Sequence, residues 1–236
     1  VGALTAATAS GQLIFLPMIS HFAVTYGWKS VSLTVGGAAA LIIPFIFLFL
    51  KEKPELLGIA PYGAPDDWQP PAPNELSAGR IAIDTLRVSS RSKDFWILFG
   101  TFLVCGLSTN GLIGTHFIPA AHDHGMAETV AAGLLALVGV FDVIGTIFSG
   151  WLTDRMDPRR LLFFYYGLRG LSLFLLPSIL FSTMHPSTLV FIIFYGLDWV
   201  ATVPPTLMLC RIVMGNQRSA VVYGWVFVGH QVGASI

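Results

Sequence analysis

The sequence predicts an all-α, polytopic membrane protein. Hydrophobic residues make up 54% of the 236 residues, and charged residues only 11%, whereas soluble domains carry about 25%. The mean hydropathy is +0.73, and the charges gather in a few short runs. A soluble protein of this length would need a charged surface. We therefore expect membrane lipids to surround the chain, and its formal net charge of zero gives no support for a nucleic-acid partner.

Apolar stretches of the length needed to span a bilayer, about 20 residues, occur seven times along the chain. They are Val1–Tyr26, Val31–Leu50, Phe95–Ala121, Ala127–Leu152, Leu161–Phe181, Thr188–Val213 and Ala220–Ile236. The chain begins and ends inside such stretches, so we expect an internal part of a longer protein whose last span is cut short.

A long polar connector separates the second stretch from the third. It covers residues 51–94 and holds six of the fourteen prolines, a composition typical of irregular linkers. We therefore expect residues 1–50 to form the last two helices of one half, and residues 95–236 to form the first five helices of a second half. Within the connector, Leu76–Lys93 has the pattern of a short helix, either on the membrane surface or in an exposed linker.

Basic residues predict the orientation. If the stretches alternate in direction, one side of the membrane carries almost all of them, and the other side carries only Lys29. Because Lys and Arg favour the cytoplasmic side, we expect the connector 51–94 to be cytoplasmic, in a plasma or inner membrane. The basic residues of that side are Lys51, Lys53, Arg80, Arg87, Arg91, Lys93, Arg155, Arg159, Arg160, Arg211 and Arg218.

Small residues and prolines interrupt several stretches. Gly145 and Ser149 have the four-residue spacing that lets helix backbones touch in lipid. Pro204 and Pro205 each remove a backbone donor and tend to kink a helix. Their role is either irregular packing or a hinge, since broken helices often mark transporter sites.

A short charged loop carries the most specific motif of the chain. Its sequence, GWLTDRMDPRR, resembles the loop signature G-x-x-x-D-R-x-G-x-R-R of the major facilitator superfamily, with Asp157 in place of the second glycine. The loop follows the connector by two spans, as does the second copy of this signature in that family, so the seven stretches correspond to helices five to eleven. The matching residues are Gly150, Asp154, Arg155, Arg159 and Arg160.

Two further stretches resemble the monocarboxylate-transporter-like branch of that family. The first, LTAATASGQLIFLP, is similar to its fifth helix and contains Gln12. Asp142 aligns with an acidic residue of its eighth helix, but the arginine expected four residues later is Thr146 here. The resemblance implies a carrier of two six-helix bundles around a cavity that opens alternately to each side. It also implies that the charged loop locks one state, with its arginines pairing across the bundle.

Four ionisable residues are expected near the middle of the membrane. At about 1.5 Å per helical residue, Asp142 lies roughly 15 Å before the charged loop and Arg169 roughly 14 Å after it; Asp198 and His230 also fall near mid-depth. A lone charge there costs several kcal/mol unless it is paired or faces a wet cavity. The structural alternative is that Asp142 and Arg169 form a pair that only fixes helix register, and that His230 bonds to its neighbours.

The functional alternative gives these residues roles in transport. Protonation of Asp142 would free the Arg169 guanidinium to hold a carboxylate. We therefore expect uptake of a proton and a small carboxylate, with Asp142 and Asp198 in proton coupling and Arg169 and His230 in substrate binding. Asn110 and Gln12 are further candidates to line the cavity, although such side chains often bond to their own backbone.

Other functions have weaker support. Exchange of one organic anion for another, or transport of a different small solute, remains open. A membrane-embedded enzyme would need a nucleophile and base that no spacing here supplies, and a retinal protein would need a lysine after Lys93. The run His122 to His124 lacks a third ligand group for a metal. We therefore expect a protein that is not an enzyme and has neither cofactor nor metal.

Overall fold

The computed structural model describes residues 2–51, 54–60, 65, 69, 77–180, 186–216 and 218–236. These residues form helices joined by turns and contain no strand, which confirms the all-α fold class. The helices are α1 (Gly2–Tyr26), α2 (Trp28–Phe49), η1 (Pro54–Leu57), α3 (Ala78–Ser89), α4 (Lys93–Gly106), η2 (Leu107–Gly114), α5 (Thr115–Asp123), α6 (Glu128–Thr153), α7 (Pro158–Leu180), α8 (Pro186–Asp198), α9 (Val203–Met214) and α10 (Ser219–Ala234).

The helices follow the predicted apolar stretches closely, with two differences. The third stretch contains a π-helix, η2, between α4 and α5. The sixth stretch is divided into α8 and α9 by a turn. Both differences lie in the middle of a stretch, where hydropathy carries no information about backbone geometry.

Two compact units divide the chain. One unit is formed by Val1–His21 together with Ala82–Ile236, and the other by Phe22–Ile81. The smaller unit contains α2, which is predominantly apolar and has no buried residue within the described structure. Gly27, between α1 and α2, has a φ of 79°, a left-handed conformation that a residue with a side chain rarely adopts.

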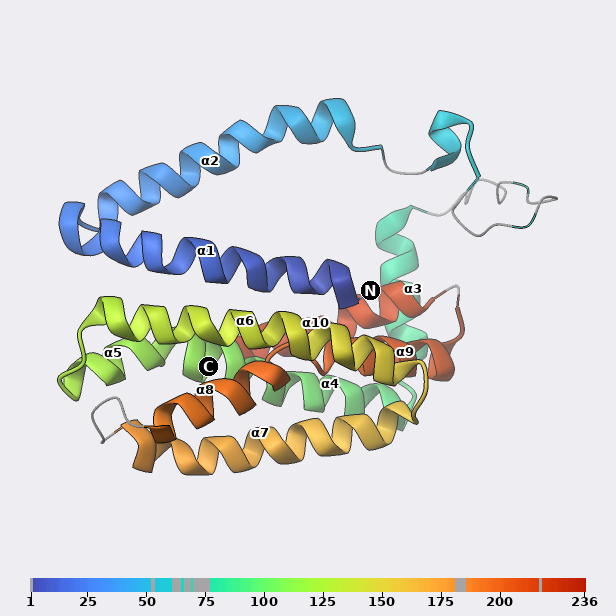
Figure 1. The fold of residues 1–236 in the computed structure, drawn as a ribbon. Coiled ribbons are helices and arrows are strands. Elements are labelled where there is room, and N and C mark those ends of the chain that lie inside the picture. The colour runs from blue at the N-terminus through green and yellow to red at the C-terminus, as the bar shows by residue number, and fades with distance from the viewer. Residues whose placement is uncertain are drawn as a thin grey trace. The chain divides into compact units, whose positions relative to one another are not determined.

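The larger unit is a bundle in which α8 lies between α6 and α7 (Figure 1), and α4 packs against α10. Its apolar core has two parts. The first apolar cluster joins η2 and α5 to α6 and α8, and includes Ile113, Phe117, Leu135, Val138, Ile192 and Tyr195. The second apolar cluster joins α4 to α7, α9 and α10, and includes Phe95, Leu98, Phe102, Leu162, Cys210 and Val226.

Among the residues that the structure describes, four helical stretches are long and apolar enough to cross a membrane. They are Trp28–Phe49, Lys93–Asp123, Glu128–Thr153 and Thr188–Met214. In the larger unit, the start of α4, the charged loop before α7 and the end of α9 come together, because Asp94, Arg159 and Val213 line one pocket. The basic residues of these segments therefore share one end of the bundle, as the predicted charge asymmetry requires.

Candidate functional site

Polar side chains are buried between the two apolar clusters. On α4, residues of the second cluster precede Cys105, and residues of the first cluster follow in η2 and α5. On α7, Arg169 lies between Leu162 of the second cluster and Leu176 of the first. The buried polar residues at this level are Thr109, Asp142, Thr146, Ser149, Arg169, Asp198, Thr202 and Thr206.

The turn between α8 and α9 is the centre of this polar layer. α8 ends at Asp198 and α9 begins at Val203, and the two appear as separate helices in Figure 1. Pro204 and Pro205 have no backbone N–H, so the carbonyls of Val200 and Ala201 lack the donor that a continuous helix would supply. The Val203 N–H donates to the Val200 carbonyl at 2.9 Å. The Ala201 carbonyl is left for a donor from another helix, since a buried backbone group without a partner is costly. We call residues 199–202 the helix break.

Arg169 binds one side of the helix break and is itself only 2% exposed. Its Nε donates to Oδ2 of Asp198 at 2.6 Å, within an ion pair. Its Nη2 donates to the backbone carbonyls of Asp198 at 2.6 Å and Trp199 at 3.1 Å. Its Nη1 donates to Sγ of Cys105 at 2.9 Å. The guanidinium thus satisfies carbonyl groups at the end of α8 and links α7 to α4.

Two side chains of α6 bind the other side of the helix break. Oδ1 of Asp142 accepts hydrogen bonds from the Val200 N–H at 3.0 Å and from the Thr146 hydroxyl at 2.8 Å. Ser149 donates to the carbonyl of Ala201 at 2.5 Å. Oδ2 of Asp142 and Oδ1 of Asp198 are buried and have no hydrogen-bond partner within the described residues.

The prediction that Asp142 pairs with Arg169 is therefore wrong. Arg169 pairs with Asp198, and Asp142 binds the backbone instead. All three residues do meet at one level, as their depths predicted. The error arises because depth says nothing about which side of a helix a residue occupies, and because the helix break brings Asp198 and its carbonyl toward α7.

Glycines allow α6 and α8 to approach closely enough for these bonds. A Cβ atom on Gly145 would lie 2.0 Å from the carbonyl oxygen of Leu197, and one on Gly196 would lie 2.8 Å from Cβ of Phe141. With Ser149 bonded to the helix break one turn later, the predicted contact through Gly145 and Ser149 is confirmed.

A cavity of about 380 Å³ lies beside the helix break, between η2 and α10. It brings together two of the predicted substrate-binding residues, Asn110 and His230. Arg169 is not among its described lining residues; Cys105, which accepts a bond from Arg169, separates it from the cavity. Gln12 lies in α1, and its side chain is outside the described part of the structure.

The charged loop lies at one end of the bundle, away from the helix break. Asp157 accepts a hydrogen bond from the Arg159 N–H at 2.9 Å and caps α7, so the missing glycine is replaced by a helix cap. Arg155 donates to the Trp151 carbonyl at 3.1 Å and lies over its ring. Gly150 lies near the end of α6, and Asp154 is the C-cap residue of that helix. Arg160 lies at the start of α7.

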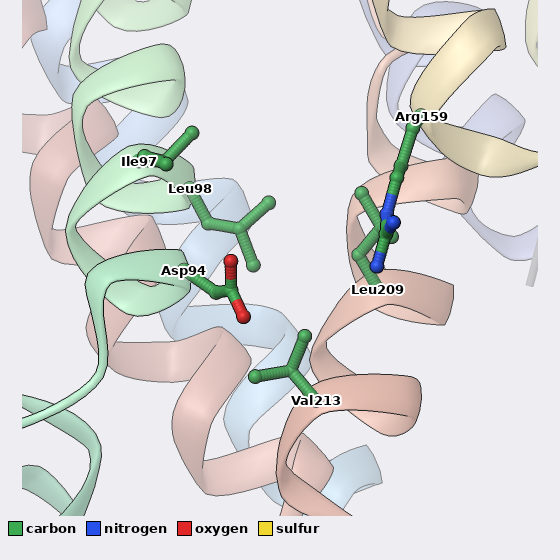
Figure 2. A pocket seen from close by; sticks show the side chains of 6 residues that line it. All are labelled: Asp94, Ile97, Leu98, Arg159, Leu209 and Val213. Carbon is green, nitrogen blue, oxygen red and sulfur yellow. The ribbon is translucent and has the colours of Figure 1, made fainter.

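A second pocket, of about 310 Å³, lies beside this loop. Figure 2 shows Asp94 of α4 and Arg159 of α7 extending into it from opposite sides. Within the described residues these two side chains form no ion pair. The role of the loop in locking one state therefore stays a prediction.

Cys105 belongs to the site, although it was not among the predicted site residues. Its Sγ accepts a bond from Arg169 and lies 3.6 Å from Oγ1 of Thr202 in the helix break. Trp199 and Thr202 were also not expected in the site. The nearest signal was the proline pair that follows, because Pro204 and Pro205 lack the N–H groups that would bond to the Val200 and Ala201 carbonyls in a continuous helix.

Comparison with known proteins identifies the family. The family model of the Major Facilitator Superfamily matches residues 1–236. The chain belongs to this superfamily. It is 27% identical to monocarboxylate transporter 12-B of Danio rerio over 243 residues, which cover 94% of this chain and 49% of that protein. It is 26% identical to the MFS-type transporter YcxA of Bacillus subtilis (strain 168) over 210 residues, which cover 86% of this chain and 46% of that protein.

A third relative, monocarboxylate transporter 12 of Xenopus laevis, is 24% identical over 242 residues, which cover 94% of this chain and 50% of that protein. The chain spans about half the length of these curated relatives. No solved structure matches it. Family membership together with the apolar helices establishes a multi-pass membrane protein with the helical-bundle fold of the superfamily.

Proposed function

We propose that the full-length protein is a secondary active transporter that moves a small organic anion, a monocarboxylate, together with a proton. One observation carries this proposal. The buried side chains of Asp142, Arg169 and Asp198 form hydrogen bonds at the helix break, which lies directly beside a cavity. Unwound backbone at such a depth is tolerated where it lines a site. The names of the relatives, which are transporters, support a carrier over an enzyme.

Charge balance supports a role for the proton. With Asp142 and Asp198 ionised, the cluster around the single Arg169 has a net negative charge, which repels an anion. Protonation of one carboxyl makes the cluster neutral. Asp142 is the proposed proton carrier, because Asp198 is held by the ion pair with Arg169. The role of Asp198 in coupling is then to balance the positive charge of Arg169.

The bonds of Asp142 connect its protonation to movement. A hydrogen bond to a charged acceptor contributes about 1.5–3 kcal/mol, and one between neutral groups about 0.5–1.5 kcal/mol. Protonation of Asp142 therefore weakens its hold on the Val200 N–H and on Thr146. The helix break is then freer to move relative to α6, as alternating access requires.

Asn110 and His230 are the proposed first contacts for the anion, since both line the cavity. A direct anion contact by Arg169 requires the helix break to open, because the guanidinium is now enclosed. We place the protein in a plasma or inner membrane with the connector 51–94 on the cytoplasmic side.

Uptake into vesicles that contain the full-length protein tests this proposal. An inward proton gradient is expected to accelerate uptake of a labelled monocarboxylate, and Asp142→Asn is expected to abolish that acceleration. Asp123→Asn, at the exposed end of α5, is the matched control and should behave as the wild type. Undiminished, equally pH-dependent uptake by Asp142→Asn would refute the proton role. Uptake that requires an internal anion and ignores the gradient would instead indicate exchange.

A further inference from the structure

Aromatic side chains form most of one wall of the cavity beside the helix break. Phe102 of α4 lies 5.8 Å from Tyr223 and 6.5 Å from Phe227, measured between ring centroids. Both of these partners belong to α10. The Phe227 ring is stacked on His230, with centroids 5.1 Å apart and planes 10° from parallel. Trp199 adds a further ring from the helix break.

Two polar residues of the cavity lie toward one end of this wall. Along α10, Tyr223 and Phe227 precede His230, and Gly233 then contacts Gly111, the neighbour of Asn110. Asn110 and His230 are therefore near the same end of α10. The described lining residues include no Asp, Glu, Lys or Arg. The cavity thus combines a polar end with a wide apolar aromatic wall.

This arrangement is much larger than a two- or three-carbon acid needs. Cavities of roughly 300–1,000 Å³ hold ligands of many heavy atoms, and this one has about 380 Å³. Aromatic walls favour flat rings, which pack in offset or edge-to-face arrangements. Phe227 lines this cavity and is 37% exposed.

We propose that the substrate is a monocarboxylate that carries a flat aromatic ring. The ring packs against Phe227 and Tyr223, and the carboxylate lies at the end formed by Asn110 and His230. This inference rests on the transporter function proposed above and specifies its substrate class.

The test compares two acids with the same charged group in vesicles that contain the full-length protein. Phenylpyruvate and pyruvate differ only by the ring. We expect kcat/KM to be about tenfold higher for phenylpyruvate, because the ring gains contact with the aromatic wall. Phe227→Ala is expected to lower that ratio about fivefold. Phe174→Ala, whose ring is 86% exposed on α7 and does not line this cavity, is the matched control and should leave the ratio unchanged.

Each other outcome overturns the inference in a distinguishable way. If pyruvate is carried as well as phenylpyruvate, the aromatic class is wrong and the carrier function stands. If phenylpyruvate is preferred and Phe227→Ala leaves the ratio unchanged, the ring binds elsewhere and the assigned wall is wrong. If neither acid is carried, the proposed monocarboxylate transport fails, and this inference fails with it.

Discussion

Two helices lose regular α-helical bonding beside the same cavity, and they do so differently. At the helix break between α8 and α9, the freed backbone groups bond to Asp142 and Ser149 of α6 and to Arg169 of α7. These partners come from other helices, and two of them are charged. The geometry of the helix break therefore depends on the position and charge of its neighbours.

In the π-helix η2, by contrast, nearby side chains of the same helical stretch satisfy the backbone. Ser108 and Thr109 both donate to the Cys105 carbonyl, at 3.0 and 2.7 Å, and Thr115 donates to the Asn110 carbonyl at 2.8 Å. Tyr195 of α8 adds a bond to the Ser108 carbonyl at 2.7 Å. Most of these bonds are local and all are uncharged, so η2 should keep its shape when the charges of the site change.

The largest expected difference concerns Arg169. Arg169→Ala leaves Asp198 buried without its ion pair and removes donors from two carbonyls, so we expect the free energy of unfolding to fall by about 3–5 kcal/mol. Thermal unfolding of the purified full-length protein measures this. Arg155→Ala, at an exposed loop residue, is the control and should change stability by at most about 0.5 kcal/mol. Equal effects of the two variants would mean that the helix break does not depend on Arg169.

The next difference concerns the close approach of α6 to α8. Gly145→Ala places a methyl group on the Leu197 carbonyl, and such overpacking costs about 1–3 kcal/mol. Gly133→Ala, in the same helix, is the control, because its new Cβ would meet no described atom within 4 Å. The same unfolding measurement separates them. A Gly145→Ala protein as stable as the Gly133→Ala protein would contradict the contact.

The smallest difference compares two serines. Ser149→Ala removes the donor to the Ala201 carbonyl, and a buried carbonyl without a partner costs about 1–3 kcal/mol. Ser108→Ala leaves the Cys105 carbonyl bonded to Thr109, so its effect should be smaller than that of Ser149→Ala. If Ser108→Ala proves the more damaging, then η2 is the more dependent of the two interruptions.

Much of this architecture could be predicted from the sequence. Hydropathy predicted the helices, since a bilayer requires long apolar runs, and the proline pair indicated an interrupted helix. The spacing of Gly145 and Ser149 predicted a close contact on α6. These features depend on local sequence alone, so no knowledge of neighbouring helices was needed.

The partners within the site could not be predicted. Asp142, Arg169 and Asp198 share a depth, and depth alone leaves every pairing open. The rotation of each helix and the geometry of residues 199–202 decide that Asp198 meets Arg169. The π-helix was also missed, because its serines and threonines are equally compatible with an ordinary α-helix that bonds to its own backbone.

Two glycines, one in α4 and one in α10, have a mechanical consequence. A Cβ on Gly233 would lie 1.9 Å from the Leu103 carbonyl oxygen, and one on Gly106 would lie 1.9 Å from that of His230. At these two points the main chains of α4 and α10 lie against each other with no side chain between them. The two helices should therefore travel as one rigid piece, so that His230 can change its position only when α4 moves with it.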